Sequence, residues 1–128
     1  MISLNIKDYR EDSPSVVTVG TFDGIHLGHR KLIDKVISIS KSKNLRSIIL
    51  TFNPHPRIIL NKDADIKLLT TQNEKNKIFE SYNIDYLVTQ DFSKPFSKLS
   101  PIEFIRDILV KKLNVKHIVI GYDHHFGK

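Results

Sequence analysis

The sequence contains no cysteine, and it has only five glycines and five prolines in 128 residues. The absence of cysteine excludes a disulfide framework, a thiolate nucleophile and a cysteine-based zinc site. No apolar run approaches the roughly 20 residues that span a bilayer, and the first residues, MISLNIKDYRED, lack the apolar core of a signal peptide. We therefore expect a cytoplasmic protein that does not bind membranes.

The charge is unbalanced, with a formal net charge of +6. A basic chain is compatible with nucleic acid, an anionic membrane surface or phosphorylated small molecules. The basic residues form separate groups beside predicted helix ends, such as Lys41 with Lys43 and Lys111 with Lys112, and they do not form one stripe interleaved with aromatics. Such groups are typical of solvated helix faces and of side chains that interact with helix dipoles, so we expect no nucleic-acid partner.

Four short, nearly continuous apolar runs predict strands buried on both faces; they span residues 16–20, 47–52, 85–90 and 117–122. Apolar residues at helical spacing lie between these runs and predict helices over 27–43, less clearly over 71–82, and from 101 to 109. The last helix has the clearest start, because Ser100, Pro101 and Glu103 match a capping serine, a first-turn proline and a reciprocal glutamate.

Strands that alternate with helices predict an α/β protein, with a Rossmann-like parallel sheet covered by helices on both faces. The length is that of about one domain, so we expect a single unit over residues 1–128.

Polar segments follow each predicted strand: GTFDGIHLGH, NPHPR, DFSKPFSKLS and DHHFGK. Ligands of open α/β sheets bind beyond the carboxyl ends of the strands. Five of the six histidines fall in or beside these segments, namely His26, His29, His55, His124 and His125. This edge of the sheet is therefore the predicted site.

The first of these segments holds three of the five glycines. Gly20 and Gly24 permit sharp turns, and Gly28 leaves room for a ligand at the first turn of the following helix. His26 and His29 are three residues apart, so both imidazoles would project from one face of that turn, beside unpaired backbone N–H groups. The pattern predicts an anion site that suits nucleotide phosphates and a leaving pyrophosphate.

The two common phosphate motifs, G-x-x-x-x-G-K-[ST] and G-x-G-x-x-G, are absent. The segment reads H-x-G-H, which is the motif of the Rossmann-like nucleotidylyltransferases. GTFDGIHLGHRKLI, TFNPHPR, LLTT, FSKLSPIEFI and IGYDHHFG occur in this order. Together they resemble the FMN adenylyltransferase module of the bacterial bifunctional riboflavin kinase/FMN adenylyltransferases, also called FAD synthetases, from about Val16 to Lys128.

The resemblance implies a transfer of AMP from ATP to FMN, with magnesium, giving FAD and pyrophosphate. It implies that His26 and His29 contact the ATP phosphates and that the nucleotide loop is shaped by Gly20, Phe22 and Asp23. Gly28 completes the predicted ATP-binding residues. It further implies that Asn53 lies at the phosphate and metal end of the site, and that Asp123 and Phe126 lie by the flavin, with Phe126 stacking on the ring. The catalytic set is then His26, His29, Asn53 and Asp123.

Members of that family continue to an I-S-S-T-x-I-R motif and a riboflavin kinase domain, whereas this sequence stops at Lys128. We therefore expect a partial adenylyltransferase domain, incomplete at its C-terminus, without the kinase domain. Substrate binding without turnover is then an alternative to adenylyl transfer for this chain, and its uncovered sheet edge would allow self-association.

Other functions remain open. One is an H-x-G-H nucleotidylyltransferase with another phosphorylated acceptor, such as phosphopantetheine or glycerol phosphate. Another is a histidine-based metal protein that uses His26, His29, His124 and His125.

Several candidate residues also fit structural roles. Asp23 before a glycine is a common turn residue, Asn53 suits a turn as well as a ligand, and prolines on both sides hold His55 extended. The aromatics Phe22, Phe92 and Phe96 would anchor loops or the core. Lys98 and Arg57 would be solvated, with contact to a phosphate as the alternative.

Overall fold

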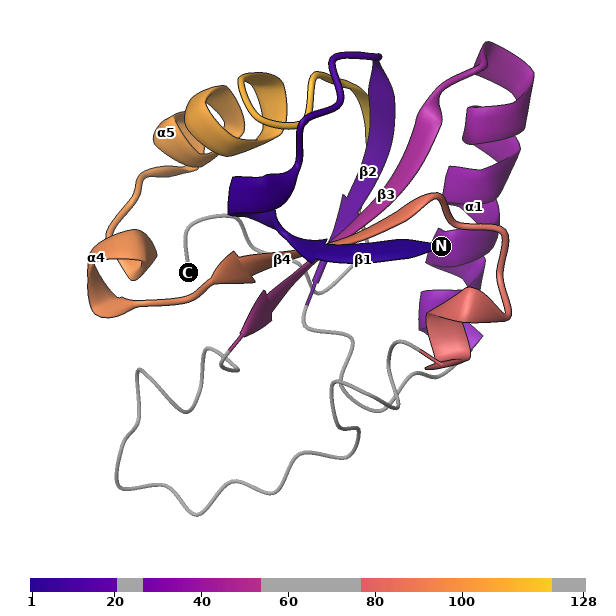
Figure 1. Cartoon of the computed structure of the whole chain (residues 1–128), viewed down its shortest axis with the longest axis horizontal. Helices are drawn as coiled ribbons and strands as arrows, with labels where there is room; N and C mark the ends of the chain where they lie inside the picture. Colours follow the sequence, from indigo (N-terminus) through magenta and orange to yellow (C-terminus); the bar gives the residue numbers. More distant parts are fainter. Residues whose placement is uncertain (21–26, 54–76, 121–128) are drawn as a thin grey trace.

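The computed structural model describes residues 1–20, 27–53 and 77–120, with side chains from residue 30 onward in the second range. Figure 1 shows the arrangement of the elements, with helices on both sides of a central sheet.

The sheet has five strands in the order β1-β4-β3-β2-β5, and every described pairing is parallel. The strands are β1 (Ile2–Asn5), β2 (Ser15–Val19), β3 (Arg46–Asn53), β4 (Tyr86–Asp91) and β5 (Val115–Val119). Four strands were predicted, and all four are confirmed with small shifts at their ends. The sequence did not predict β1, which is four residues long, lies at the edge and is only partly buried.

Helices cover both faces, as predicted. They are α1 (Leu27–Lys43), α4 (Lys94–Ser97), α5 (Pro101–Phe104), the π-helical η2 (Ile105–Val110) and a short 3-10 helix, η1 (Ile6–Asp8). Of the predicted helix over 71–82, residues 77–80 are helical and residues 71–76 lie outside the described part.

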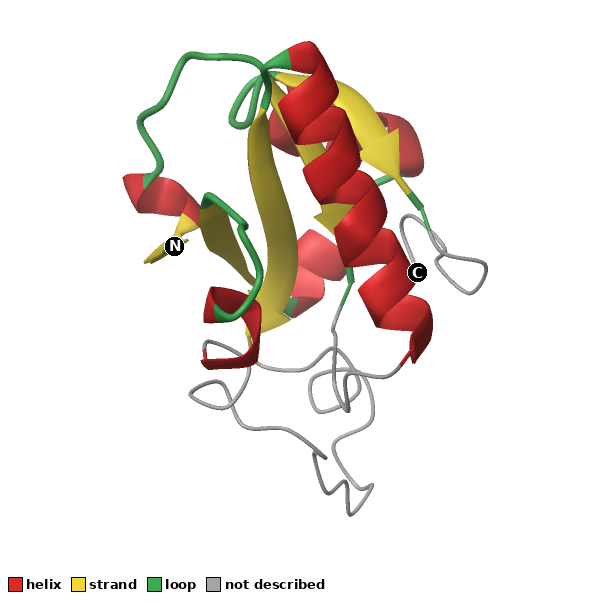
Figure 2. Ribbon diagram, turned by 90° about the vertical axis from the view of Figure 1, so that its right-hand side faces the viewer, coloured by secondary structure: helices red, strands yellow, loops and turns green. Residues whose placement is uncertain are grey.

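The core has two halves, one on each face of the sheet. On one face α1 buries Ile33 against Ile49, and Figure 2 shows this long helix lying across the strands. On the other face Phe104 and Leu109, from α5 and η2, pack with Leu50. The Rossmann-like architecture expected from the sequence is therefore confirmed.

The helix α1 ends where its sequence turns polar. Asn44 adopts a left-handed conformation with a φ of 54°, and the Leu45 N–H donates to the Ser40 carbonyl at 3.0 Å. This bond across the last turn closes the helix in the way of a Schellman motif. Lys41 and Lys43 lie in that last turn, as their predicted role as partners of the helix dipole requires.

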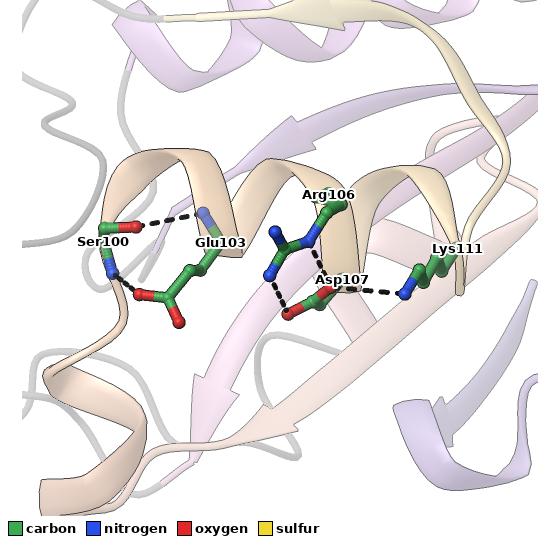
Figure 3. A network of polar contacts seen from close by, with 5 residues as sticks. All are labelled: Ser100, Glu103, Arg106, Asp107 and Lys111. Carbon is green, nitrogen blue, oxygen red and sulfur yellow. Dashed lines mark hydrogen bonds and ion pairs between the residues drawn. The ribbon is translucent and has the colours of Figure 1, made fainter.

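The predicted start of the third helix is also confirmed (Figure 3). The Ser100 hydroxyl accepts from the Glu103 N–H at 3.1 Å, and the Ser100 N–H donates to Glu103 Oε1 at 3.0 Å. This reciprocal pair satisfies two backbone groups that would otherwise lack partners. The bond from the Ser100 N–H, with a smaller effect from the Ser100 side chain, also lowers the pKa of the Glu103 carboxyl.

The same helix carries an exposed ion pair beyond its first turn (Figure 3). Arg106 Nε donates to Asp107 Oδ1 at 2.8 Å, and Lys111 Nζ lies 3.6 Å from the same oxygen. The bond from Arg106 lowers the pKa of Asp107. Because these groups are largely solvated, we expect little stabilisation from them.

Candidate functional site

The path of the chain defines a switch point at the carboxyl ends of β2 and β5. After β2 the chain crosses one face through α1 and enters β3, and after β4 it crosses the other face through α5 and η2 and enters β5. The crossover that leaves β2 and the crossover that enters its neighbour β5 therefore lie on opposite faces of the sheet. Ligand sites of open α/β sheets lie at such a point.

The motif segments are attached to these strand ends. Residues 21–26 follow β2 and Gly20, and residues 121–128 follow β5 and Ile120. The predicted site residues Phe22, Asp23, His26, Asp123 and Phe126 lie outside the described residues. The same holds for His55, Arg57, His124 and His125, so their proposed roles stay predictions.

Gly28 and His29 belong to the first turn of α1. The helix thus begins within the H-x-G-H motif, as the sequence predicted, although the side chain of His29 is not described. The first turn contains no acidic residue. The partial positive charge at the helix N-terminus is therefore not offset from within the helix.

Gly20 directly follows β2, and its backbone still pairs with the neighbouring strand. Its N–H donates to the Leu50 carbonyl at 3.0 Å, which extends the β2–β3 ladder by one bond. Gly20 is partly buried. The sequence placed it at the end of the strand, and this is confirmed.

Asn53 is the last residue of β3, and its side chain is exposed at the carboxyl edge. Its carbonyl accepts the Phe92 N–H at 3.1 Å, and its Cα pairs with that of Asp91. The backbone is thus fixed by the sheet, and the exposed side chain makes no hydrogen bond to the other described residues.

A polar group that the sequence did not predict lies beside Asn53. Asn5 Nδ2 donates to Asp91 Oδ1 at 3.0 Å, and Lys7 Nζ lies 3.2 Å from Asp91 Oδ2. The Asn5 side chain also accepts the Lys7 N–H at 3.0 Å. The contact joins residues 86 positions apart through the β1–β4 pairing, so no local signal could have revealed it.

Three aromatic rings lie at the same edge, on the face covered by α5. The Phe52 ring centroid is 5.7 Å from that of Phe92 and 6.0 Å from that of Phe96, and the last two are 5.6 Å apart. Phe92 is buried, whereas Phe52 and Phe96 are half-buried. The anchoring role expected for Phe92 and Phe96 is confirmed, and Phe52 adds a ring that was not predicted from the sequence.

The edge therefore combines helix N–H donors, exposed oxygen atoms and partly open aromatic rings. Among the described residues, no group of three or more His, Cys, Asp or Glu side chains could hold a metal ion. None of the helices in the described ranges is long and apolar enough to cross a membrane.

Comparisons of the sequence with known families and curated proteins agree on one family. A family model described as FAD synthetase matches residues 8–128. The bifunctional riboflavin kinase/FMN adenylyltransferase of Buchnera aphidicola subsp. Schizaphis graminum is 42% identical over 116 residues, which is 91% of this chain and 37% of that protein. The protein of the same name from Buchnera aphidicola subsp. Acyrthosiphon pisum is 43% identical over 123 residues, which is 96% of this chain and 39% of that protein. The chain thus spans less than two fifths of the length of these curated relatives.

A solved structure shares the fold. The crystal structure of a macrolide-efflux protein from Streptococcus pneumoniae superposes with a TM-score of 0.84 at 31% identity, covering 99% of this chain and 43% of that chain.

Proposed function

The chain belongs to the FAD synthetase family, and on this premise we propose that it transfers AMP from ATP to FMN, giving FAD and pyrophosphate. The observation that supports this most directly is the family match over residues 8–128, in which the H-x-G-H motif runs into α1 at the switch point of the sheet. In this proposal residues 1–128 belong to the FMN adenylyltransferase domain, and riboflavin kinase activity lies outside them.

The reaction needs no nucleophile from the protein. An oxygen of the FMN phosphate attacks the α-phosphorus of ATP, the bond to the bridging oxygen of the β-phosphate breaks, and pyrophosphate leaves with that electron pair. The protein holds the two phosphates in line and stabilises the charge that grows on the leaving group.

We assign the ATP phosphates to the start of α1. Its free backbone N–H groups and the side chains of His26 and His29 would donate to the triphosphate. The absence of an acidic residue from the first turn supports this assignment. The loop around the nucleotide would be formed by Gly20, Phe22 and Asp23, and Gly28 in the first turn of α1 would leave room for the phosphates.

Magnesium fits the oxygen atoms at this edge. Mg²⁺ is usually held by one or two protein oxygens together with substrate phosphates, so it needs no larger cluster of protein ligands. The exposed amide of Asn53, whose backbone the sheet fixes, is suited to this role. When bound, the ion would neutralise charge on the phosphate oxygens.

The flavin would lie on the side of the edge where the aromatic rings are. Half-buried Phe52 and Phe96 leave part of an apolar surface open, and a planar ring system is stabilised by such a surface. Asp123 and Phe126 are the further flavin contacts in this proposal.

The direct test is FAD formation from ATP and FMN, followed by chromatography. FAD and pyrophosphate should appear in equal amounts, and excess EDTA should stop the reaction until Mg²⁺ is restored. FMN binding, measured by quenching of its fluorescence, separates binding from turnover. A chain that converts another phosphorylated acceptor and ignores FMN would contradict the proposal.

The two motif histidines provide the sharpest variants. His26→Ala and His29→Ala should each lower turnover by roughly 10²-fold, the scale of losing one preorganised donor. The control is His117→Gln, because His117 lies in β5 away from the carboxyl end. Unchanged turnover in both alanine variants would remove these residues from the mechanism.

We also propose a cytoplasmic location and self-association of the chain through a sheet edge. In the described sheet, β1 and β5 are the edge strands, and edge strands present backbone groups that can pair with a second copy.

A further inference from the structure

One polar atom next to the aromatic rings has no hydrogen-bond partner. Gln90 Oε1 is shielded from solvent and, among the described residues, accepts no hydrogen bond. A buried acceptor without a donor costs free energy that a ligand donor would recover. This atom therefore indicates a position where a ligand can gain specificity.

The orientation of the Gln90 amide is fixed by its neighbour. Gln90 Nε2 donates to the Asp91 carbonyl at 3.0 Å. Exchanging the nitrogen and the oxygen would set two acceptors against each other, so the oxygen must point away from that carbonyl. The NH₂ group has a second N–H, which this bond does not use.

Gln90 lies beside the aromatic rings. It is the Cα partner of Phe52, and alternate β4 residues Tyr86 and Val88 face the same half of the core as Phe52. The amide and the half-buried rings of Phe52 and Phe96 thus belong to one face at the carboxyl end of the sheet.

We propose that Gln90 determines specificity for the flavin by accepting the N3–H of the isoalloxazine ring. This inference rests on the proposed function. The oxidised ring has one N–H, which lies between two carbonyl groups on its pyrimidine edge, while the rest of the ring is broad and planar. The aromatic rings match the planar part, and the Gln90 oxygen with its remaining N–H matches the edge.

The test compares FMN with N3-methyl-FMN, in which a methyl group replaces the donor. The protein should bind FMN roughly tenfold more tightly than the methylated compound, about the value of one hydrogen bond. Gln90→Met has similar length but no strong acceptor, so it should bind FMN roughly tenfold more weakly and bind the two compounds within about twofold. Affinity for an ATP analogue should stay unchanged.

Thr89→Val is the matched control, because Thr89 precedes Gln90 on β4 and faces the other side of the sheet. It should keep the tenfold preference. Urea unfolding should give Gln90→Met a midpoint no lower than that of the unsubstituted protein, because the substitution removes an unpartnered buried oxygen.

The outcomes separate the two claims. Binding of FMN with a preference that persists in Gln90→Met would overturn the role of Gln90 and leave the proposed function standing. A protein that binds no FMN would overturn both.

Discussion

Tyr9 illustrates how burial alone changes the chemistry of a residue. It is 4% exposed, its hydroxyl has no partner among the described residues, and its ring lies edge-on to Tyr86 with the centroids 5.1 Å apart. Burial, with a smaller effect from Tyr86, raises the pKa of Tyr9 from 10.0 to about 12. The unfolded chain therefore loses this proton before the folded protein does, so stability falls as pH rises from about 10 to about 12.

Tyr9→Phe should remove this alkaline sensitivity. The variant deletes a buried hydroxyl that lacks a partner, so its stability at neutral pH should match or exceed that of the unsubstituted protein. Above pH 10 the difference in favour of the variant should grow. Urea unfolding from pH 7 to pH 11 measures both effects, with Tyr82→Phe as control because Tyr82 is half-buried in the other half of the core. A variant less stable at every pH would show that the hydroxyl has a partner.

At the level of residues, the sequence predicted the positions of residues that lie next to a strand end or a helix start. Gly20, Gly28 and Asn53 follow from the ends of strands and the start of a helix, and the structure confirms these positions. The contact of Asn5 with Asp91 depends on which strands become neighbours. Local pattern carries no information about that choice, so the contact could not be predicted.

At the level of elements, the sequence correctly predicted helix features whose residues lie within a few positions of one another. The capping serine and its glutamate are three positions apart, and both bonds form. The π-helical form of η2 has no such local code. There Lys111 N–H bonds to the Arg106 carbonyl five residues back, and the sequence of this stretch reads as ordinary helix.

Ser100→Ala tests how much the cap contributes. Loss of the side-chain acceptor should destabilise the protein by about 1 kcal/mol. The lowered pKa of Glu103 means that its charge stabilises the folded state above its ordinary pKa, and this contribution is lost as pH falls through the lowered value. Alanine keeps the Ser100 N–H, which is the main cause of the lowered pKa, and removes the smaller effect of the side chain. The loss of stability in Ser100→Ala should therefore be only slightly larger at neutral than at acidic pH.

Urea unfolding at neutral and acidic pH measures this loss. The control is Ser97→Ala, because among the described residues the Ser97 hydroxyl donates back to the Lys94 carbonyl of its own helix. Equal destabilisation by the two variants would show that the cap adds nothing beyond a surface hydroxyl.

At the level of the whole molecule, the sequence predicted the class of fold but not the strand order. Alternating strands and helices require parallel pairing, yet they do not say that β2 would lie between β3 and β5. That order follows from crossovers on opposite faces, because α1 and η2 each bury apolar residues that need a separate face of the sheet. The resulting switch point, and so the place of the site, is a property of the complete fold.

The same sheet leads to the last prediction, which concerns association between copies. An exposed isoleucine lies at each edge of the sheet. Ile2 in β1 is 53% exposed, and Ile120, directly after β5, is 50% exposed. A lysine at a strand edge opposes pairing with a second chain. If copies associate through β5, Ile120→Lys should weaken association in sedimentation at high protein concentration, whereas Ile102→Lys, at a 73% exposed position on α5, should not. Ile2→Lys tests the β1 edge in the same way.

The net charge of +6 repels like copies, so association should strengthen as salt screens this charge. A monomer at every salt concentration would contradict the prediction.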